Sequence, residues 1–406
     1  MLSIESLRTR AVDGAARPSA APAHSAPAAP ADTFSPSAPG DAPQSPRKWT
    51  VMVYSAGDNN LEPYLFTNLD DAEKVGSDPT TAVVSQFDRG AGKGGCQRLL
   101  IEKDTKPGVL GSTVVGNLGT KVDMAAPKTL SDFITWSKAN YPAEHYMLII
   151  SDHGNGWQGC VEDDSAGTWM KLPALTQGLA DARKATGSGI DIIGFDACLM
   201  ASTEVAHQLK DEASYLVASE ETEGAAGWPY SRVLNAEMLA DMQKMLTERV
   251  SVSPRELAAH VVSSAQSVPD DLPTMSAIDL AKAPTLTAAA DQFGQAILAT
   301  ETSRWTLRGL ARQTQGFYDY KDLYDFASQI SRSPKISDKA LKTAAEGVKQ
   351  AVEATVFAES HSKRYPNAHG ITIDTHKPRS GYDELTFTRD SHWAQAMRKM
   401  NSIWEQ

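Results

Sequence analysis

His153 and Cys198 are the two residues whose types and positions could support covalent catalysis in this sequence. His153 follows the apolar run at 146–150 and opens the stretch "HGNGW", and Cys198 closes the run "IDIIGFDAC" 45 positions later. A free thiol has a pKa near about 8.5, and a nearby imidazole can raise the thiolate fraction or accept the proton during attack. If both runs are neighbouring parallel strands, their carboxyl ends meet at one edge of a sheet and bring the two side chains together.

Three further groups around this pair would complete a site for acyl transfer. Gly154 has no side chain, so its backbone N–H could approach a substrate carbonyl, and the N–H of Cys198 is a second candidate donor to the oxyanion. Asp196 lies two positions before Cys198, so both side chains share a face if the strand continues to Cys198. A carboxylate there would receive a guanidinium or ammonium group, which predicts cleavage after Arg or Lys.

Each of these residues also has a structural interpretation. A buried cysteine at a strand end can be a small core residue, a histidine before Gly-Asn-Gly can be a turn residue, and Asp196 could accept bonds from a loop backbone. The carboxylates at 161–164 and 219–221 are interpreted as solvated loop charges, with a calcium or substrate role as the alternative. Trp157 is interpreted as a packing residue.

The elements that must position these residues alternate along the chain. We expect a hairpin around the glycines at 90–95, helix caps at Thr129 and Ser253, and a helix end near Gly187. The expected strands are 49–54, 82–88, 98–104, 146–150, 190–198, 214–221, 274–280 and 369–375, and the expected helices are 129–141, 174–187, 253–268, 283–299, 321–331, 338–358 and 391–404. This order predicts an α/β fold, a mainly parallel sheet flanked by helices, with a helix-rich C-terminal part after about residue 235.

Charge and cysteine content limit the classes of partner. The 406 residues carry 39 basic and 50 acidic side chains, a formal charge of −11, which argues against nucleic acid and anionic membranes. No apolar run approaches the roughly 18 residues that span a bilayer. Three cysteines, Cys96, Cys160 and Cys198, are too few for a disulfide framework, although a Cys96–Cys160 pair is left open. A monomer acting on peptides or proteins with basic residues is expected.

The N-terminal residues differ in composition from the rest. Residues 15–47 are rich in proline and alanine, so the sequence predicts a disordered leader at 1–47, a catalytic domain at 48–235 and a helix-rich part at 236–406 that packs on and extends it. The start, "MLSIESLRTR", lacks a basic segment followed by an apolar core. The compartment therefore stays open, with export or a cell-envelope location by a non-classical route as one interpretation.

Taken together, several segments resemble the clostripain-like cysteine peptidases, which have the caspase–gingipain type of fold. The resemblance covers residue 49 to the C-terminus and rests on "WTVMVYSAGDNNLE" (49–62), "TLSDFITW" (129–136), "YMLIISDHGNGW" (146–157), "DIIGFDACLMAS" (191–202), "YLVASEETEGAAGWPY" (214–230), "FYDYKDLYDFA" (317–327) and "HGITID" (369–374). It implies that His153 is the general base and acid and that Cys198 is the nucleophile. It also implies an oxyanion hole from the backbone of Gly154 and Cys198, and a specificity pocket at Asp196.

The resemblance has two further implications. Members often cleave themselves between the two catalytic strands, and Lys171 is the basic residue that this segment offers. Some members use calcium, but "VEDD" at 161–164 lacks the spacing of an EF-hand loop, so no metal is assigned.

The leading hypothesis is a cysteine endopeptidase that cleaves after Arg or Lys through a thioester intermediate. The alternative is a catalytically inactive, caspase-like binding module. The sequence contains no Gly-x-Ser-x-Gly motif, which argues against a serine hydrolase, and no His-Glu-x-x-His motif, which argues against a zinc peptidase.

Overall fold

The computed structural model describes residues 47–234 and 252–402. The leader expected at 1–47 lies outside this part of the chain, apart from Arg47. The described residues all belong to one compact unit, and the domain boundary expected near residue 235 stays a prediction.

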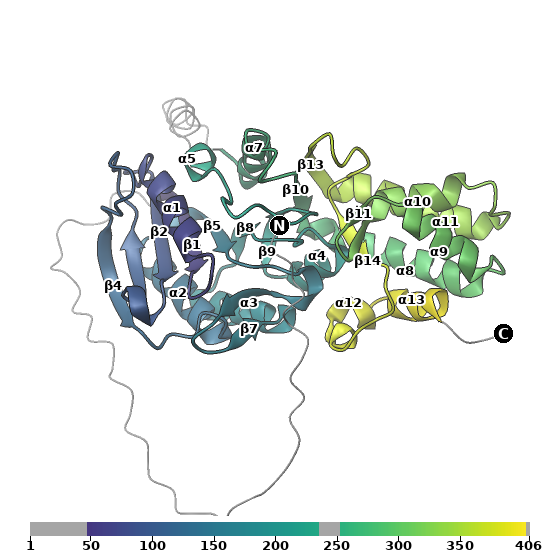
Figure 1. Cartoon of the computed structure of the whole chain (residues 1–406), viewed down its shortest axis with the longest axis horizontal. Coiled ribbons are helices and arrows are strands. Elements are labelled where there is room, and N and C mark those ends of the chain that lie inside the picture. The colour runs from purple at the N-terminus through teal and green to yellow at the C-terminus, as the bar shows by residue number, and fades with distance from the viewer. Residues whose placement is uncertain (1–46, 235–251, 403–406) are drawn as a thin grey trace, which may run out of the picture. The chain divides into compact units, whose positions relative to one another are not determined.

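A nine-stranded sheet runs through the described residues (Figure 1). Its strands are β1 (Arg47–Ala56), β2 (Thr81–Asp88), β3 (Cys96–Leu100), β4 (Thr113–Gly119), β5 (Ala143–Ser151), β8 (Ile190–Asp196), β9 (Ala213–Ala218), β10 (Thr274–Asp279) and β13 (Val356–His361). They lie in the order β13-β10-β9-β8-β5-β1-β2-β3-β4. The central strands from β9 to β2 are parallel, and antiparallel strands extend the sheet at both edges. The expected mainly parallel sheet is confirmed.

Helices cover both faces of this sheet, which explains why its central strands are continuous apolar runs. Along β1, Val51 and Val53 belong to one core, and Met52 and Tyr54 to the other. One face carries α1 (Glu62–Glu73), α5 (Tyr230–Val233) and α7 (Pro254–Ala265), and the opposite face carries α2 (Pro127–Asn140), α3 (Leu172–Thr186) and α4 (Thr203–Leu209) (Figure 1). The strand ends are therefore held rigidly between two layers.

The C-terminal part adds helices and a second, small sheet beside α4 (Figure 1). The helices are α8 (Ala283–Ala299), α9 (Arg304–Gln313), α10 (Leu323–Arg332), α11 (Lys339–Thr355), α12 (Thr386–Arg389) and α13 (Trp393–Asn401). The small sheet has the order β11 (Gly316–Phe317), β12 (Tyr320–Asp322), β14 (Thr372–Asp374), and β6 (Cys160–Asp163) pairs with β7 (Thr168–Met170). The C-terminal part also supplies β10 and β13 to the main sheet.

Local signals set several boundaries as expected. β2 and β3 form the antiparallel pair predicted around the glycines. Helix α3 ends at Gly187, whose φ of 71° suits a residue without a side chain. Helix α7 begins with a capping box, in which Ser253 and Glu256 bond each other's backbone N–H.

Other boundaries differ from the sequence prediction. Helix α2 is capped at Ala126 with proline at its first position, so Thr129 is not its cap. The strand expected at 190–198 ends at Asp196, and the helix expected at 338–358 gives way at Val356 to strand β13. The expected strands 98–104 and 369–375 are shorter, as β3 and β14. Helices α1, α4 and α9 were not predicted, because their apolar residues alone do not distinguish a short helix from a loop.

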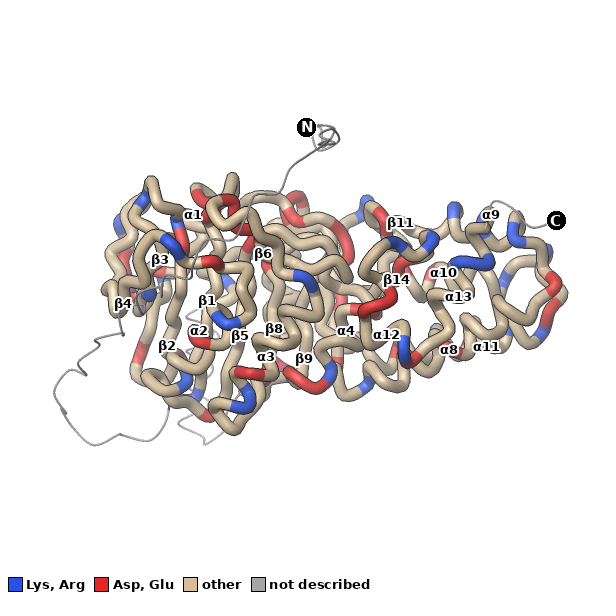
Figure 2. Tube along the Cα trace, turned by 90° about the horizontal axis from the view of Figure 1, so that it is seen from below, with Lys and Arg blue, Asp and Glu red and all other residues tan. Residues whose placement is uncertain are grey.

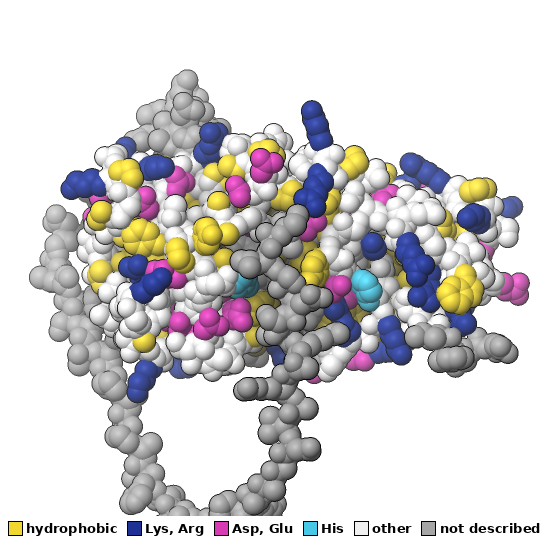
Figure 3. Space-filling view, in the orientation of Figure 1, with side chains coloured by type: hydrophobic (Ala, Val, Ile, Leu, Met, Phe, Trp, Pro, Cys, Tyr) yellow, Lys and Arg dark blue, Asp and Glu magenta, His cyan; other side chains and the backbone are white. Residues whose placement is uncertain are grey.

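Charged residues of both signs are interspersed along the trace and over the molecular face that Figure 3 shows (Figures 2 and 3). Among the helices of 47–234 and 252–402, none combines the length and apolar character needed to cross a bilayer. Cys96, Cys160 and Cys198 are all free thiols, so the Cys96–Cys160 disulfide that the sequence left open does not form.

Candidate active site

The two segments expected to carry the chemistry leave neighbouring strands at the same edge of the main sheet. Strands β5 and β8 are parallel, with Ser151 opposite Asp196 at their last pair. His153 follows the first strand and Cys198 the second, and both line one pocket with a volume of about 250 Å³. A pocket of this size is smaller than a typical small-molecule site of about 300–1,000 Å³ and suits a single side chain.

Asp196 lines the same pocket, but for a different reason from the one expected. Strand β8 ends at Asp196, so the alternation of a strand does not reach Cys198. The chain turns sharply instead, and Leu199 has a φ of 67° in this turn. Asp196 therefore faces the pocket from the last position of the strand, and Cys198 faces it from the turn.

Asn60 orients the imidazole of His153. This residue lies between β1 and α1, and its Oδ1 is 2.8 Å from Nε2 of His153. Because an amide oxygen can only accept, Nε2 carries the proton and Nδ1 is left as the basic nitrogen. The His153 side chain is partly buried, and burial lowers its pKa, an effect that Glu162 and Asp164 partly offset. The imidazole is therefore neutral at neutral pH and able to accept a proton.

The thiol of Cys198 is held by the loop that follows β9. The backbone N–H of Glu223 donates to Sγ at 3.3 Å. Burial raises the pKa of the Cys198 thiol to about 11, and the Glu223 carboxylate adds to that effect. A thiol and a neutral imidazole, rather than a thiolate and an imidazolium, are thus the resting forms of this pair.

Gly154 is required by a close approach of the two segments. A Cβ at this position would lie 2.5 Å from the carbonyl oxygen of Cys198 and 3.1 Å from its backbone nitrogen. Gly154 forms an isolated antiparallel bridge with Cys160. Two backbone hydrogen bonds close this bridge, from Val161 N–H to the His153 carbonyl and from Asn155 N–H to the Gly159 carbonyl. Within residues 47–234 and 252–402, the N–H groups of Gly154 and Cys198 find no acceptor. Two unpaired donors therefore lie beside the thiol.

Asp196 is buried and held by three donors. Its carboxylate accepts from Ser151 Oγ at 2.7 Å, from Tyr230 Oη at 2.9 Å and from the backbone N–H of Trp228 at 3.0 Å. Burial raises the pKa of Asp196, and these donors oppose that rise. A Cβ at Gly227 would lie 2.7 Å from an Asp196 oxygen, so the glycine keeps this side of the carboxylate open.

Glu223 is the residue of this pocket that the sequence did not single out. Its two carboxyl oxygens are buried and form no hydrogen bond of good geometry with the described residues, although the Trp228 indole, Asp196 and the Ala197 N–H lie near enough to affect its protonation. Burial and the neighbouring Asp196 carboxylate raise its pKa well above the usual range. A carboxyl group that burial and a second carboxylate keep neutral can bind a cation or a set of donors as it ionises.

Asp152, and Asp163 of the "VEDD" segment, accept hydrogen bonds from the surrounding chain. Asp152 accepts from the Asn59 side chain at 2.8 Å and from the Glu162 backbone N–H at 2.6 Å. Both oxygens of Asp163 accept backbone N–H groups, from Met124 and Ala166. Across the described ranges, no group of three or more His, Cys, Asp or Glu side chains is placed to hold a metal ion. The segment does not fit a calcium site, and no catalytic step is assigned to calcium.

Lys171 lies away from this pocket, at the start of α3. Its side chain is exposed, while the flanking Met170 and Leu172 are buried. The carbonyl of Lys171 accepts from the backbone N–H of Ala174 at 2.9 Å and of Leu175 at 3.0 Å. The bond that the sequence marked for self-cleavage is thus part of the first turn of a helix.

The sequence has a clear family assignment. A family model described as the Clostripain family, Peptidase C11, matches residues 53–399. The chain belongs to the clostripain family. It is therefore a cysteine-type peptidase that acts on peptide or protein substrates, and the alternative of an inactive binding module is not supported.

Several relatives support this assignment to the clostripain family. The chain is 23% identical to the protein named clostripain from Hathewaya histolytica over 412 aligned residues, which cover 86% of this chain and 78% of the relative. A secreted C11 cysteine protease from Bacteroides thetaiotaomicron, solved with an irreversible peptide inhibitor, has a TM-score of 0.63 at 20% identity and covers 86% of this chain and 99% of its own. An inactive zymogen C11 protease from Parabacteroides distasonis has a TM-score of 0.62 at 19% identity, and the match covers 86% of this chain and 99% of that protein. The caspase-like fold expected from the sequence is confirmed.

Proposed function

We propose that this clostripain-family peptidase is an endopeptidase that cleaves after Arg or Lys through a Cys198–His153 dyad. The observation that carries the specificity is the pair of carboxyl groups in the pocket beside Cys198. Asp196 accepts three well-formed hydrogen bonds, whereas the donors near Glu223, the Trp228 indole and the Ala197 N–H, fall short of good hydrogen-bond geometry. A guanidinium or ammonium group entering the pocket would supply close donors and a positive charge to Glu223, whereas an apolar side chain would supply neither.

The reaction follows from the resting forms of the two groups. Nδ1 of His153 accepts the thiol proton as Sγ of Cys198 attacks the scissile carbonyl carbon. The oxyanion accepts the free N–H groups of Gly154 and Cys198, each worth about 2.7–4 kcal/mol in typical acyl-transfer sites. The leaving amine takes the proton from His153, and a thioester remains on Cys198. Water then attacks the thioester, its proton passes to His153, and the thiol is regenerated as the acid product departs.

We also infer that the enzyme cleaves itself after Lys171. Support comes from the exposed position of the lysine between the two catalytic segments. The helical bonding of its carbonyl makes unfolding of the first turn of α3 a precondition for this cleavage.

A fluorogenic peptide amide with Arg at the cleavage site tests the main proposal. We expect turnover that iodoacetamide abolishes and that Cys198→Ala lacks, because the thiol is the nucleophile. Glu223→Gln should lower kcat/KM for the Arg substrate about 10- to 100-fold, in keeping with the ~1.5–3 kcal/mol of a charged hydrogen bond.

Asp270→Asn is the matched control, since it removes one exposed carboxylate from the neighbouring cleft without touching the pocket. Its kcat/KM should match that of the wild type. Full turnover in Cys198→Ala would reject the nucleophile, and an unchanged preference for Arg in both Asp196→Asn and Glu223→Gln would reject the specificity pocket.

A further inference from the structure

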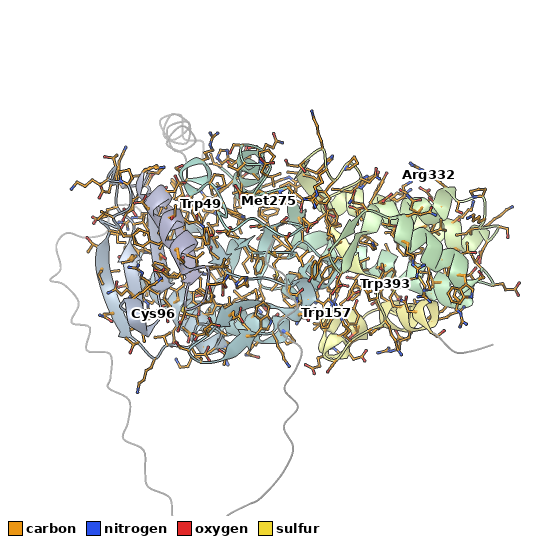
Figure 4. All side chains as sticks on the ribbon, viewed as in Figure 1. Trp49, Cys96, Trp157, Met275, Arg332 and Trp393 are labelled. Atoms are coloured by element: carbon orange, nitrogen blue, oxygen red, sulfur yellow. The ribbon has the colours of Figure 1, made fainter. Side chains whose placement is uncertain are left out.

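We propose that Tyr320 and Asp374, which lie opposite each other in the small C-terminal sheet, are positioning residues. They fix the loop that carries His153, so that the imidazole keeps its position relative to Cys198. This inference rests on the proposed dyad. The pair belongs to strands β12 and β14, more than 160 positions after His153 in the sequence. Figure 4 shows Trp157, the end of the histidine loop, where the main sheet meets the C-terminal elements.

The main sheet alone does not determine how the two reacting groups face each other. Its register fixes the chain only as far as Ser151 on β5 and Asp196 on β8. His153 and Cys198 both lie beyond these strand ends, where single bonds such as that from Asp152 N–H to the Asp196 carbonyl, at 3.2 Å, replace the continuous ladder. Contacts from the rest of the molecule add to these local bonds, and they matter because a shift of about 1 Å between reacting groups can cost about 100-fold in rate.

Tyr320 fixes the loop that follows His153. Its hydroxyl donates to the carbonyl of Asn155 at 3.1 Å and accepts from the backbone N–H of Trp157, also at 3.1 Å. Gly156 lies between these two groups with a φ of 55°, and a Cβ there would be 2.2 Å from the hydroxyl. The tyrosine hydroxyl thus occupies the space where any other residue at position 156 would place its side chain.

Asp374 holds the end of the same loop. Its Oδ2 accepts from the indole Nε1 of Trp157 at 2.8 Å. The ring of Trp157 is buried and packs edge-on against Tyr382, with centroids 5.0 Å apart. Because Tyr320 and Asp374 are direct cross-strand partners, their side chains share one face of the small sheet and grip the loop together.

Strand β14 also forms hydrogen bonds with the segment that follows Cys198. Thr372 N–H donates to the carbonyl of Ala201 at 2.9 Å, and Thr203 Oγ1 donates to the carbonyl of Thr372 at 2.9 Å. The Asp374 N–H donates to Oε1 of the buried Glu204 at 3.0 Å. One short strand therefore bonds the cysteine segment directly and, through Asp374 and its partner Tyr320, the histidine segment. The small sheet acts as a rigid clamp between the two.

Tyr320→Phe is the variant that isolates this role, because it keeps the ring and removes both hydroxyl bonds. Activity is measured as kcat per active site titrated with an irreversible basic peptidyl inhibitor, so loss of folded protein does not count as loss of rate. We expect kcat to fall at least tenfold with KM within twofold of the wild type. The acid limb of kcat should also move to higher pH, because a looser loop exposes His153.

Tyr324→Phe is the matched control, since this tyrosine bonds Glu353 on the surface of α10 and α11. Its kcat per site should equal that of the wild type. Trp157→Phe provides a second variant, which removes the bond to Asp374 but keeps an aromatic ring, and it should lower kcat per site as well.

Unchanged kcat per titrated site and an unchanged pH profile in Tyr320→Phe and Trp157→Phe would overturn the clamp while leaving the dyad intact. Turnover that persists in Cys198→Ala would instead overturn the proposed function on which the clamp rests.

Discussion

Burial determines the protonation of the reacting groups before a substrate arrives. It lowers the pKa of His153 and raises that of Cys198 to about 11, so the pair rests as neutral imidazole and thiol. Catalysis then depends on transferring the proton during attack rather than on a preformed thiolate. Buried carboxyl groups that form no hydrogen bond of good geometry with the described residues, such as Glu223, indicate which substrate groups the site can accept.

The pH profile of kcat/KM tests these protonation states. We expect the acid limb to have a midpoint below pH 6.5, because His153 must be neutral to accept the proton and its pKa is lowered. Asp164→Asn should move the midpoint further down, since that carboxylate raises the pKa of the imidazole. A midpoint above 6.5 would contradict this assignment, and iodoacetamide labelling of Cys198 should accelerate up to about pH 11.

Part of the candidate site could be predicted from residue types alone. His153 and Cys198 follow apolar strands, and the expectation that parallel strand ends meet brought them to one edge. The same reasoning, applied to the end of β1, would have pointed to Asn60. Glu223 carries no such signal, because its importance comes from its burial beside Asp196, which depends on how Trp228 and Asp196 pack around it.

At the scale of elements, turns and helix ends determine access to individual peptide bonds. The carbonyl of Lys171 accepts the first hydrogen bonds of α3, and its neighbours on both sides are buried. A peptidase needs an extended substrate, so this bond can reach an active site only when the helix end unfolds.

Self-cleavage should therefore be controlled by the first turn of α3. We expect a fragment that begins at Leu172 to accumulate slowly in the wild type and faster in Ala174→Gly, which weakens the helix by about 1 kcal/mol. N-terminal sequencing and intact mass over time provide the measurement. Lys171→Gln should abolish the fragment, while Lys184→Gln, a change in the last turn of the same helix, should not. A fragment with the same start in Lys171→Gln or in Cys198→Ala would contradict self-processing at this bond.

At the scale of the whole molecule, buried carboxyl groups connect the two parts of the chain. Glu204 follows the cysteine segment and accepts from Asp374 N–H and Tyr382 Oη of the C-terminal part. Burial raises its pKa from 4.5 to about 7. The folded state thus binds this proton more tightly than the unfolded state does.

Stability should therefore fall as the pH rises from about 4.5 through about 7. Glu204 should lower the free energy of unfolding by about 3 kcal/mol over this range. The full decrease is reached only above the pKa of Glu204 in the folded state. Urea unfolding at pH 5 and pH 8 measures it. Glu204→Gln keeps the accepting oxygen and should show a smaller loss between the two pH values, whereas the exposed Glu353→Gln should lose as much as the wild type. Equal losses in both variants would contradict this role of Glu204.

The sequence by itself determined the central strands and most of the longer helices, the two catalytic candidates and the family resemblance. These features follow from local periodicity, strand-end residues and short motifs, each of which is written in adjacent positions. Only the tertiary structure decided that β8 ends at Asp196, that Glu223 is buried beside Asp196 and that β14 lies against both catalytic segments. The reason is physical: hydrogen-bond partners more than 160 residues apart are chosen by packing of the whole chain, and no local pattern records them.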